Sequence, residues 1–330
     1  MHKGQPSFIF NSRRARRAWT LLLGVLSFLF ALILVNLIAG WMQLSEDSLL
    51  RQNGVRAGGE ASLVYDGKRA IDQQIYYHNL GNVVEEAKSA DVLFLGNSRI
   101  LCAMDPGVLE SFSTESGVRF YNLGFGYDEG SVFAMRMIDK YRLRPKIVVV
   151  NCDKSFWENS STAGKAALAG RAWKAWVDVK EFQLAWHLRR FVHRWIPKLV
   201  DPEKIAIWRE HENGAWNLSV RDDRQATVSY VATESDDSLP SKYVKAVGRF
   251  RKAMELRGIQ TVLTLVPSPM ANATFAKQIA RTSGMDLILV SSEEAFTSFD
   301  GDHLNDESSR KFTQLFLSQF EVKGYSEESR

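Results

Sequence analysis

Two short stretches carry residue types that could perform nucleophilic chemistry together. The first is an apolar run, residues 92–95, which ends in Gly96-Asn97-Ser98 and continues into a segment of helical tendency. A buried parallel strand typically has this pattern, an apolar run closed by a turn, so Ser98 is expected at the carboxyl end of a strand. Open α/β sheets bind their ligands there, and free N–H groups at a helix start can hold an oxyanion. Ser98 is therefore a candidate nucleophile.

The second stretch is a turn with Asp300 and His303, which precedes an amphipathic segment at residues 309–320. An Asp three residues before a His can accept a hydrogen bond from one imidazole nitrogen, which leaves the other nitrogen free to take a proton from a serine. Ser98 as nucleophile, His303 as general base and Asp300 as orienting carboxylate would form a Ser-His-Asp site. On its own, the second stretch would fit a helix-capping acidic turn equally well.

Together, the two stretches resemble the SGNH (GDSL-like) hydrolase superfamily over roughly residues 88–320. Members carry the serine in a Gly-Asp-Ser turn after the first strand, and the base and its orienter in an Asp-x-x-His turn before the last helix. The resemblance implies a flavodoxin-like fold. It also implies an oxyanion hole in which a glycine after the second strand donates its N–H. The sequence Tyr-Asn-Leu-Gly ending at Gly124 fits that motif, so Gly124 and the Ser98 N–H are the candidate donors.

Two departures from the superfamily pattern bear on the site. Asn97 stands where the family usually has Asp, and the expected third strand, residues 146–150, is not followed by a Gly-x-Asn-Asp motif. The third oxyanion donor is therefore unassigned, with Asn151 as the candidate at that place. Similar losses occur in the divergent, membrane-anchored branch that modifies cell-surface polysaccharides, such as proteins of alginate acetylation and of teichoic-acid D-alanylation.

Strand and helix patterns alternate around these motifs, which indicates βαβ units and a parallel sheet. We expect an α/β, flavodoxin-like domain at residues 88–325, with helices flanking the sheet. The expected strands cover residues 92–95, 118–123, 146–150, 259–266 and 285–290, and the expected helices cover residues 79–88, 128–141, 241–257, 274–281 and 309–320.

Residues 155–241 interrupt this alternation and are rich in tryptophan. Within them, four apolar residues fall on one face of a helix: Leu184, Leu188, Phe191 and Trp195. We expect a helical insertion whose aromatic side packs on the α/β core. The alternative is a basic amphipathic helix that contacts the membrane surface or roofs a glycan groove.

The N-terminus has the pattern of an uncleaved membrane anchor. Four arginines within residues 13–17 precede residues 19–41, which contain no charged residue. At about 1.5 Å per residue the segment reaches about 34 Å, enough to cross a bilayer core of about 30 Å. A cleaved signal peptide is the alternative, but its apolar region normally covers about 7 to 15 residues. We expect a cytoplasmic tail at residues 1–18, a transmembrane helix at residues 19–41 and a juxtamembrane stalk with little structure at residues 42–87.

The arginines would keep the N-terminus in the cytoplasm, so the α/β domain would face the periplasm from a bacterial inner membrane. The net charge of +4 is small and dispersed, which argues against a nucleic-acid partner. Only Cys102 and Cys152 occur, so there is no disulfide framework. Two buried thiols are expected, with a single disulfide as the alternative. The histidines lack partners at metal-ligand spacing, so neither a metal nor another cofactor is expected.

Three functions are compatible with these patterns. The first is O-acyl, in particular O-acetyl, transfer to an extracytoplasmic polysaccharide through an acyl-enzyme, because a tethered enzyme suits a membrane acyl donor. Its partner would be a membrane-bound acyltransferase or polysaccharide export machinery. The second is an esterase that removes such groups. The third is a catalytically silent assembly or glycan-binding subunit of an export complex, which the incomplete oxyanion motif would fit.

Overall fold

The structure is a computed structural model in which the chain divides into two units, Met1–Gln52 and Asn53–Arg330. It describes residues 23–27, 30, 60–66, 69–126, 129–158, 160–195, 206–218, 226–230, 239–292 and 295–322. In the first unit, the described residues are helical and exposed. Most of the predicted transmembrane helix, residues 19–41, lies outside the described residues. Within the described part of the chain, no helix combines the length and apolar character that crossing a bilayer requires.

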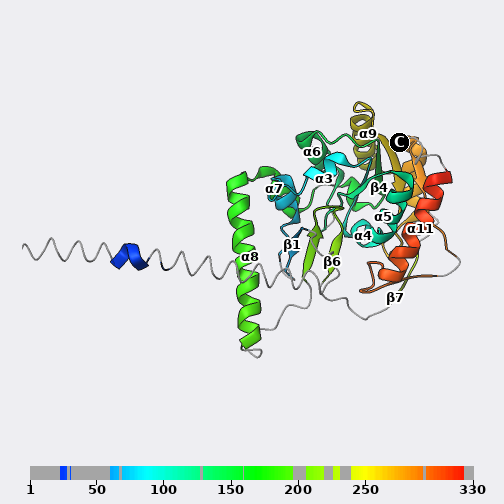
Figure 1. The fold of residues 1–330 in the computed structure, drawn as a ribbon. Helices are drawn as coiled ribbons and strands as arrows, with labels where there is room; N and C mark the ends of the chain where they lie inside the picture. The colour runs from blue at the N-terminus through cyan, green and yellow to red at the C-terminus, as the bar shows by residue number, and fades with distance from the viewer. Residues whose placement is uncertain are drawn as a thin grey trace, which may run out of the picture. The chain divides into compact units, whose positions relative to one another are not determined.

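A five-stranded parallel sheet forms the centre of the second unit (Figure 1). In spatial order, its strands are β3 (Phe120–Asn122), β2 (Val92–Leu95), β4 (Ile147–Asn151), β8 (Gln260–Thr264) and β9 (Asp286–Ile288). The first of these strands along the chain, β2, lies between the second and the third, which is the flavodoxin-like order. Every residue of β2 and β4 is buried, as expected for parallel strands covered on both faces. The predicted α/β, flavodoxin-like sheet is confirmed.

Helices cover both faces of this sheet. Val92 and Phe94 belong to a core cluster with side chains of three helices, α4 (Ser98–Ala103), α5 (Pro106–Ser116) and α11 (Asp306–Val322). Leu93 and Leu95 alternate with them and therefore face the other side. Three further helices pack together apart from that cluster: α6 (Ser131–Tyr141), α9 (Ser241–Glu255) and α10 (Ala273–Ser283). Figure 1 shows α4, α5 and α11 on one side of the sheet and α6 and α9 away from them.

A small antiparallel sheet lies outside the central one and has the order β1 (Ala61–Tyr65), β5 (Ile207–Glu210), β6 (Trp216–Leu218). Two more helices follow β1, α2 (Asp72–Tyr77) and α3 (Glu85–Ser89). The prediction of a stalk with little structure over residues 42–87 is therefore wrong for its described part. The reason is non-local: β1 pairs with β5, and α2 packs on helices of the insertion, partners that lie far along the chain.

The tryptophan-rich insertion is only partly helical. It begins with η1 (Ser155–Trp157), α7 (Thr162–Ala169) and α8 (Ala172–Trp195). Beyond them, the prediction of a helical insertion is wrong, because β5, β6 and β7 (Ala226–Val228) are strands, and β7 pairs with β10 (Phe296–Ser298).

The face of α8 that packs on the domain also differs from the expected one. Phe182 and Trp186 are buried, and Trp186 packs edge-on against Trp208 of β5. Leu184 and Leu188 are exposed, and the side chains of the other two residues on the expected face lie outside the described set. Apolar residues occur on both sides of this helix, so their spacing alone does not determine which side is buried. Cys102 and Cys152 form no disulfide; Cys152 is buried as expected, whereas Cys102 is only partly buried. Burial raises the pKa of the Cys152 thiol to about 12.

Candidate active site

Ser98 is the first residue of α4, immediately after the turn that leaves β2. Gly96 allows this turn, because its φ is +151° and a Cβ at this position would lie 2.8 Å from Cβ of Asn151. The side chain of Asn97 accepts a hydrogen bond from the Arg99 N–H at 3.1 Å and so caps the helix. The strand, the glycine and the cap together place Ser98 at the carboxyl end of the central sheet, as the sequence predicts.

The structure brings Ser98, His303 and Asp300 together in one hydrogen-bonded chain. His303 Nε2 lies 2.8 Å from Ser98 Oγ, and His303 Nδ1 lies 2.7 Å from Asp300 Oδ2. With a proton on Nδ1, the histidine donates to the carboxylate and its Nε2 accepts from the serine hydroxyl. The Phe299 ring stacks on the imidazole, with centroids 5.8 Å apart. The arrangement has the geometry of a nucleophile, a general base and an orienting group.

The turn that holds Asp300 and His303 is fixed from within. The second carboxylate oxygen of Asp300 accepts from the backbone N–H groups of Asp302, at 2.9 Å, and of His303, at 2.8 Å. Gly301 has a φ of +95°, and its N–H donates to the Ser298 hydroxyl at 2.9 Å. Burial by itself would raise the pKa of Asp300, but the hydrogen bond and charge of His303 and these backbone donors outweigh it and lower the pKa to about 2. Asp300 is therefore an anion throughout the neutral range.

Arg99 connects this turn to the end of β4 and was not anticipated from the sequence. Its guanidinium donates to Asp153 at 2.9 Å and, through two nitrogens, to both carboxylate oxygens of Asp302 at 3.0 and 2.9 Å. Burial raises the pKa of Asp153, and the charge of Arg99 opposes that rise. The available signal was an arginine directly after the candidate nucleophile, with one acidic residue after β4 and another inside the Asp-x-x-His turn.

The three candidate oxyanion donors differ in whether they already donate a hydrogen bond within the protein. The Ser98 N–H has no partner among the described residues. The Gly124 N–H donates to Asn122 Oδ1 at 3.1 Å, and a Cβ at Gly124 would lie 2.7 Å from Cγ2 of Ile100. The side-chain amide of Asn151 donates to Asp153 at 2.9 Å, and its oxygen accepts from the Val266 N–H at 3.0 Å. The oxyanion roles of Gly124 and Asn151 stay predictions, and both donors would have to change partners to fulfil them.

A pocket of about 380 Å³ opens over Ser98, Asp300 and His303. Much of its other wall comes from the small antiparallel sheet, including Tyr65, Ile207, Trp216 and Leu218. Gly126 lies close under Trp216, since a Cβ there would meet the indole ring at 2.8 Å. The sequence did not reveal this wall, because its strands were expected to be stalk or helix.

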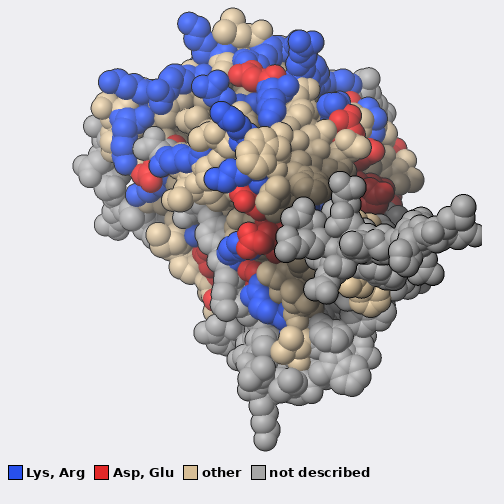
Figure 2. Space-filling model, turned by 90° about the vertical axis from the view of Figure 1, so that its left-hand side faces the viewer, with Lys and Arg blue, Asp and Glu red and all other residues tan. Residues whose placement is uncertain are grey.

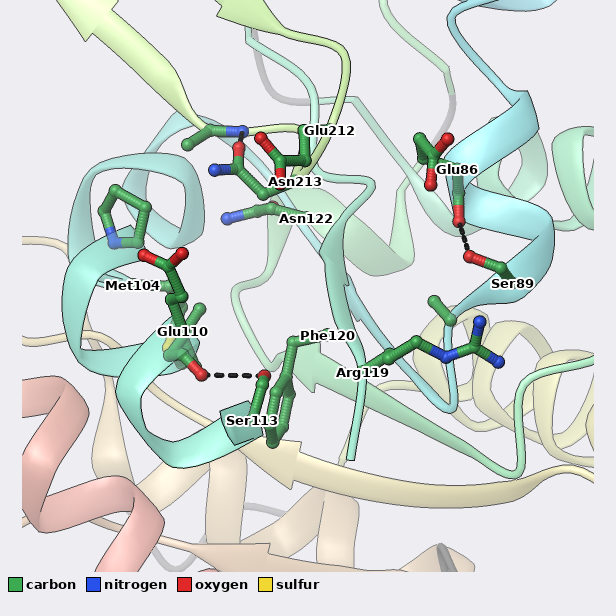
Figure 3. A pocket seen from close by; sticks show the side chains of 14 residues that line it. Glu86, Ser89, Met104, Glu110, Ser113, Arg119, Phe120, Asn122, Glu212 and Asn213 are labelled. Atoms are coloured by element: carbon green, nitrogen blue, oxygen red, sulfur yellow. Dashed lines mark hydrogen bonds between the residues drawn. The ribbon is translucent and has the colours of Figure 1, made fainter. Parts of the chain in front are cut away.

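A second cavity, of about 220 Å³, lies beside the edge strand β3 (Figure 3). Glu86, Glu110 and Glu212 reach it from three separate elements, and Arg119 is among the other residues that line it. It contains no serine–histidine pair, so the pocket over Ser98 is the candidate active site. Among the described residues, no group of His, Cys, Asp and Glu side chains is arranged to hold a metal ion.

No protein-family model and no curated protein matches the chain. Three solved structures that match it cover 70–75% of the chain, and the chain spans nearly their whole length, 97–99%. They are a protein from Bacteroides fragilis NCTC 9343 provisionally named an acylhydrolase (14% identity, TM-score 0.34), a GDSL-like lipase from Bacteroides thetaiotaomicron VPI-5482 (13%, 0.34) and TesA (9%, 0.35). One of these names, that of the GDSL-like lipase, contains the same family term as the predicted resemblance. At such TM-scores the likeness carries no argument about activity, which has to come from the site itself.

Proposed function

We propose that the protein is an enzyme of acyl-ester chemistry, with Ser98 as nucleophile, His303 as general base and Asp300 as the orienting carboxylate. The observation that carries this proposal is the continuous hydrogen-bonded chain from Ser98 Oγ through both nitrogens of His303 to Asp300, at 2.8 and 2.7 Å, inside a pocket. Asp300 supports the role because its lowered pKa keeps it ionised while the imidazole becomes positively charged.

In the first half of the reaction, Ser98 Oγ attacks the ester carbonyl while His303 Nε2 takes the hydroxyl proton. The ester's alcohol then leaves with that proton, and an acyl group remains on Ser98. In the second half, a water molecule or a second hydroxyl group gives a proton to His303 and attacks the acyl carbonyl. The bond between Ser98 Oγ and the acyl carbon then breaks, and His303 returns the proton to Ser98 Oγ. Atoms and protons balance in both halves without a cofactor.

Oxyanion stabilisation sets the expected rate. The Ser98 N–H is the one open donor among the three candidates, whereas Gly124 and Asn151 donate to neighbouring side chains. Removing one oxyanion donor typically costs about 100- to 1,000-fold in rate. We therefore expect slow turnover of simple esters, with faster turnover where a substrate draws the other donors into place.

For the substrate, we propose an O-acyl group, in particular O-acetyl, that is transferred to an extracytoplasmic polysaccharide. Two features support this choice. The wall with Tyr65 and Trp216 offers aromatic surface on which a sugar ring could pack. The predicted anchor at residues 19–41 would hold the domain at the periplasmic side of an inner membrane, beside a membrane acyl donor or an export complex. Hydrolysis of such esters uses the same acyl-enzyme and is the alternative.

The test uses the full-length protein in detergent with 4-nitrophenyl acetate. Ser98→Ala and His303→Ala should each lower kcat/KM by at least about 1,000-fold, and the double variant should be little worse, because such residues act as a unit. Intact-protein mass spectrometry should find one acetyl group on the wild type and none on Ser98→Ala. Ser111→Ala, which removes an exposed helical serine, is the matched control and should keep full activity.

Adding acetylated and unacetylated oligosaccharides separates the alternatives. Faster loss of the acetyl-enzyme together with an acetylated sugar product would support transfer, and faster release of acetate from an acetylated sugar would support the esterase. Turnover in Ser98→Ala equal to that of the wild type would refute the nucleophile and leave an assembly or glycan-binding role.

A further inference from the structure

A third pocket, which is polar and has a volume of about 390 Å³, lies among α6, α7 and α9 and shares no lining residue with the pocket over Ser98. Some of the residues that line it belong to the segments that come after β3 and after β4 in the chain, and the others belong to α7 and α9. Its wall includes the first residues of α6 and the side chains of Ser160, Lys165 and Arg249. The proposed acyl chemistry uses none of them.

The start of α6 presents free hydrogen-bond donors to this pocket. Ser131 and Val132, the first two helical residues, line it, and no side chain caps the helix. The N–H groups of Phe133 and Ala134 turn back to Gly130, whereas those of Ser131 and Val132 have no partner among the described residues. Unsatisfied N–H groups at a helix start favour an anion, both as donors and through the helix dipole.

Ser160 provides a second and independent observation. Only 6% of the residue is exposed, and within the part of the chain that the structure describes its buried hydroxyl has no hydrogen-bond partner. A buried hydroxyl without a partner normally costs stability, so native proteins retain few of them. Ser160 lines the pocket, where a bound group with acceptor oxygens would satisfy its hydroxyl.

The charges around the pocket favour the same kind of group. Three cations line it, Lys165 from α7 and Lys242 and Arg249 from α9, against one carboxylate, that of Glu158. Glu158 accepts from Lys242 at 3.0 Å and from the Tyr243 hydroxyl at 2.9 Å, so it is already engaged. Lys165 and Arg249 have no carboxylate partner among the described residues.

The surface around the pocket is also positively charged. Figure 2 shows Lys and Arg side chains gathered over the upper part of one face, at the height where Figure 1 places α6, α7 and α9, with only scattered Asp and Glu between them. A surface of this sign raises the local concentration of anions around the pocket.

We propose that this pocket binds a phosphoryl group, at a site separate from the Ser98 pocket. A phosphoryl group carries up to two negative charges and three acceptor oxygens, which suits donors that approach from several directions: two backbone N–H groups, a hydroxyl, an ammonium and a guanidinium. A sugar phosphate and a phospholipid headgroup both supply this chemistry. The site does not depend on the proposed acyl transfer.

The experiment titrates the full-length protein in detergent with inorganic phosphate by isothermal calorimetry. The wild type should bind phosphate, and affinity should fall as NaCl is raised. Lys165→Gln with Arg249→Gln should weaken the Kd by about tenfold or more, equivalent to about 1.4 kcal/mol. Lys245→Gln removes one positive charge, as each of the two pocket substitutions does, from an exposed residue of α9 that does not line the pocket, and it should shift the Kd by less than about twofold.

Ser160→Ala separates a binding role from a structural one. Because the hydroxyl has no partner, its removal should leave the thermal unfolding temperature unchanged or slightly higher, while phosphate binding weakens. Glucose 6-phosphate and short-chain phosphatidylglycerol, titrated in parallel, identify the source by whichever binds more tightly than inorganic phosphate. No phosphate binding by the wild type, or equal binding by the pocket variants and Lys245→Gln, would overturn the proposal, whatever the outcome of the ester assays.

Discussion

Arg99 and Arg209 each join separate segments of the chain through carboxylates, but at different depths. Arg209 is completely buried and donates to both oxygens of Asp72, at 3.0 and 2.9 Å, while its guanidinium lies 4.0 Å from the centre of the Tyr76 ring. It also donates to the backbone carbonyls of Gly214 and Asn122. In this way it fastens the small antiparallel sheet to α2 and to the end of β3.

Arg99 lines the pocket over Ser98, where one of its two carboxylate partners is open to water. Asp153 is 5% exposed, whereas Asp302 is 36% exposed. Loss of Arg209 would leave the buried carboxylate of Asp72 without a positive charge beside it. Loss of Arg99 would affect two carboxylates less severely: Asp153 would keep its hydrogen bonds to two Asn side chains, and water could hydrate Asp302. Similar ion pairs therefore serve different ends: the first maintains the fold of the pocket wall, and the second positions the His303 turn.

The largest effect is expected for Arg209→Met. Breaking a buried pair by removing one partner typically costs about 3–5 kcal/mol of unfolding free energy, because the other charge stays buried. Urea denaturation followed by tryptophan fluorescence should show this loss, and ester turnover should fall with it, since the wall with Trp216 depends on the same sheet. The double variant Asp72→Leu with Arg209→Met should be less destabilised than Arg209→Met alone. A single variant as stable as the wild type would contradict the structural role of Arg209.

Arg99→Gln should destabilise the fold less than Arg209→Met does, but it should lower ester turnover by more than its loss of stability explains. We expect a loss of about 1–3 kcal/mol, because Asp153 keeps its hydrogen bonds to Asn97 and Asn151. We also expect kcat to fall by about 10- to 100-fold with little change in KM, because misplacement of a catalytic group by about 1 Å can cost that much. Arg99→Lys should recover part of kcat, since it retains the charge but not the fork to Asp302.

Arg119→Gln is the matched control for Arg99→Gln. It removes an exposed arginine whose carboxylate partner, Asp91, lies 3.6 Å away, so both stability and kcat should stay close to wild type. If Arg99→Gln reduced stability and left kcat at the control value, Arg99 would be a structural residue like Arg209.

This contrast also separates what the sequence could predict from what it could not. The sheet and the Ser98 turn were predicted because their signals are local: a short apolar run, a glycine and a polar residue in succession. The Asp300 and His303 turn has a fixed spacing of the same kind. The small sheet was missed because β1 finds its partner β5 only after the whole central region has been crossed. The pair of Asp72 and Arg209 joins residues 137 positions apart, and neither has a local pattern that reveals the other.

The oxyanion donors show a further limit. Gly124 lies at the expected place in the chain, but the direction of its N–H depends on a contact with Asn122 two residues earlier. The Asn151 amide is likewise taken by Asp153, through a network that includes Arg99 and Asn97. A motif gives the position of a backbone group along the chain, whereas the partner of that group depends on side chains that the motif does not specify.

The smallest expected effect is that of Asp300→Asn on the free energy of unfolding, and its size depends on pH. Since the pKa of Asp300 is lowered to about 2 from an ordinary value of 3.8, its ionised form stabilises the fold. This contribution is complete above about pH 4 to 5 and is lost as the pH falls towards 2, where the folded state also takes up the proton. It should be no more than about 1 kcal/mol, because the Asp300 side chain is 30% exposed and water screens its interaction with His303.

Urea denaturation of the wild type and of Asp300→Asn should therefore give a small difference in the free energy of unfolding at pH 6, and this difference should shrink between pH 4 and pH 2. A difference that stayed constant to pH 2 would mean that Asp300 acts through the shape of its turn, not through its charge.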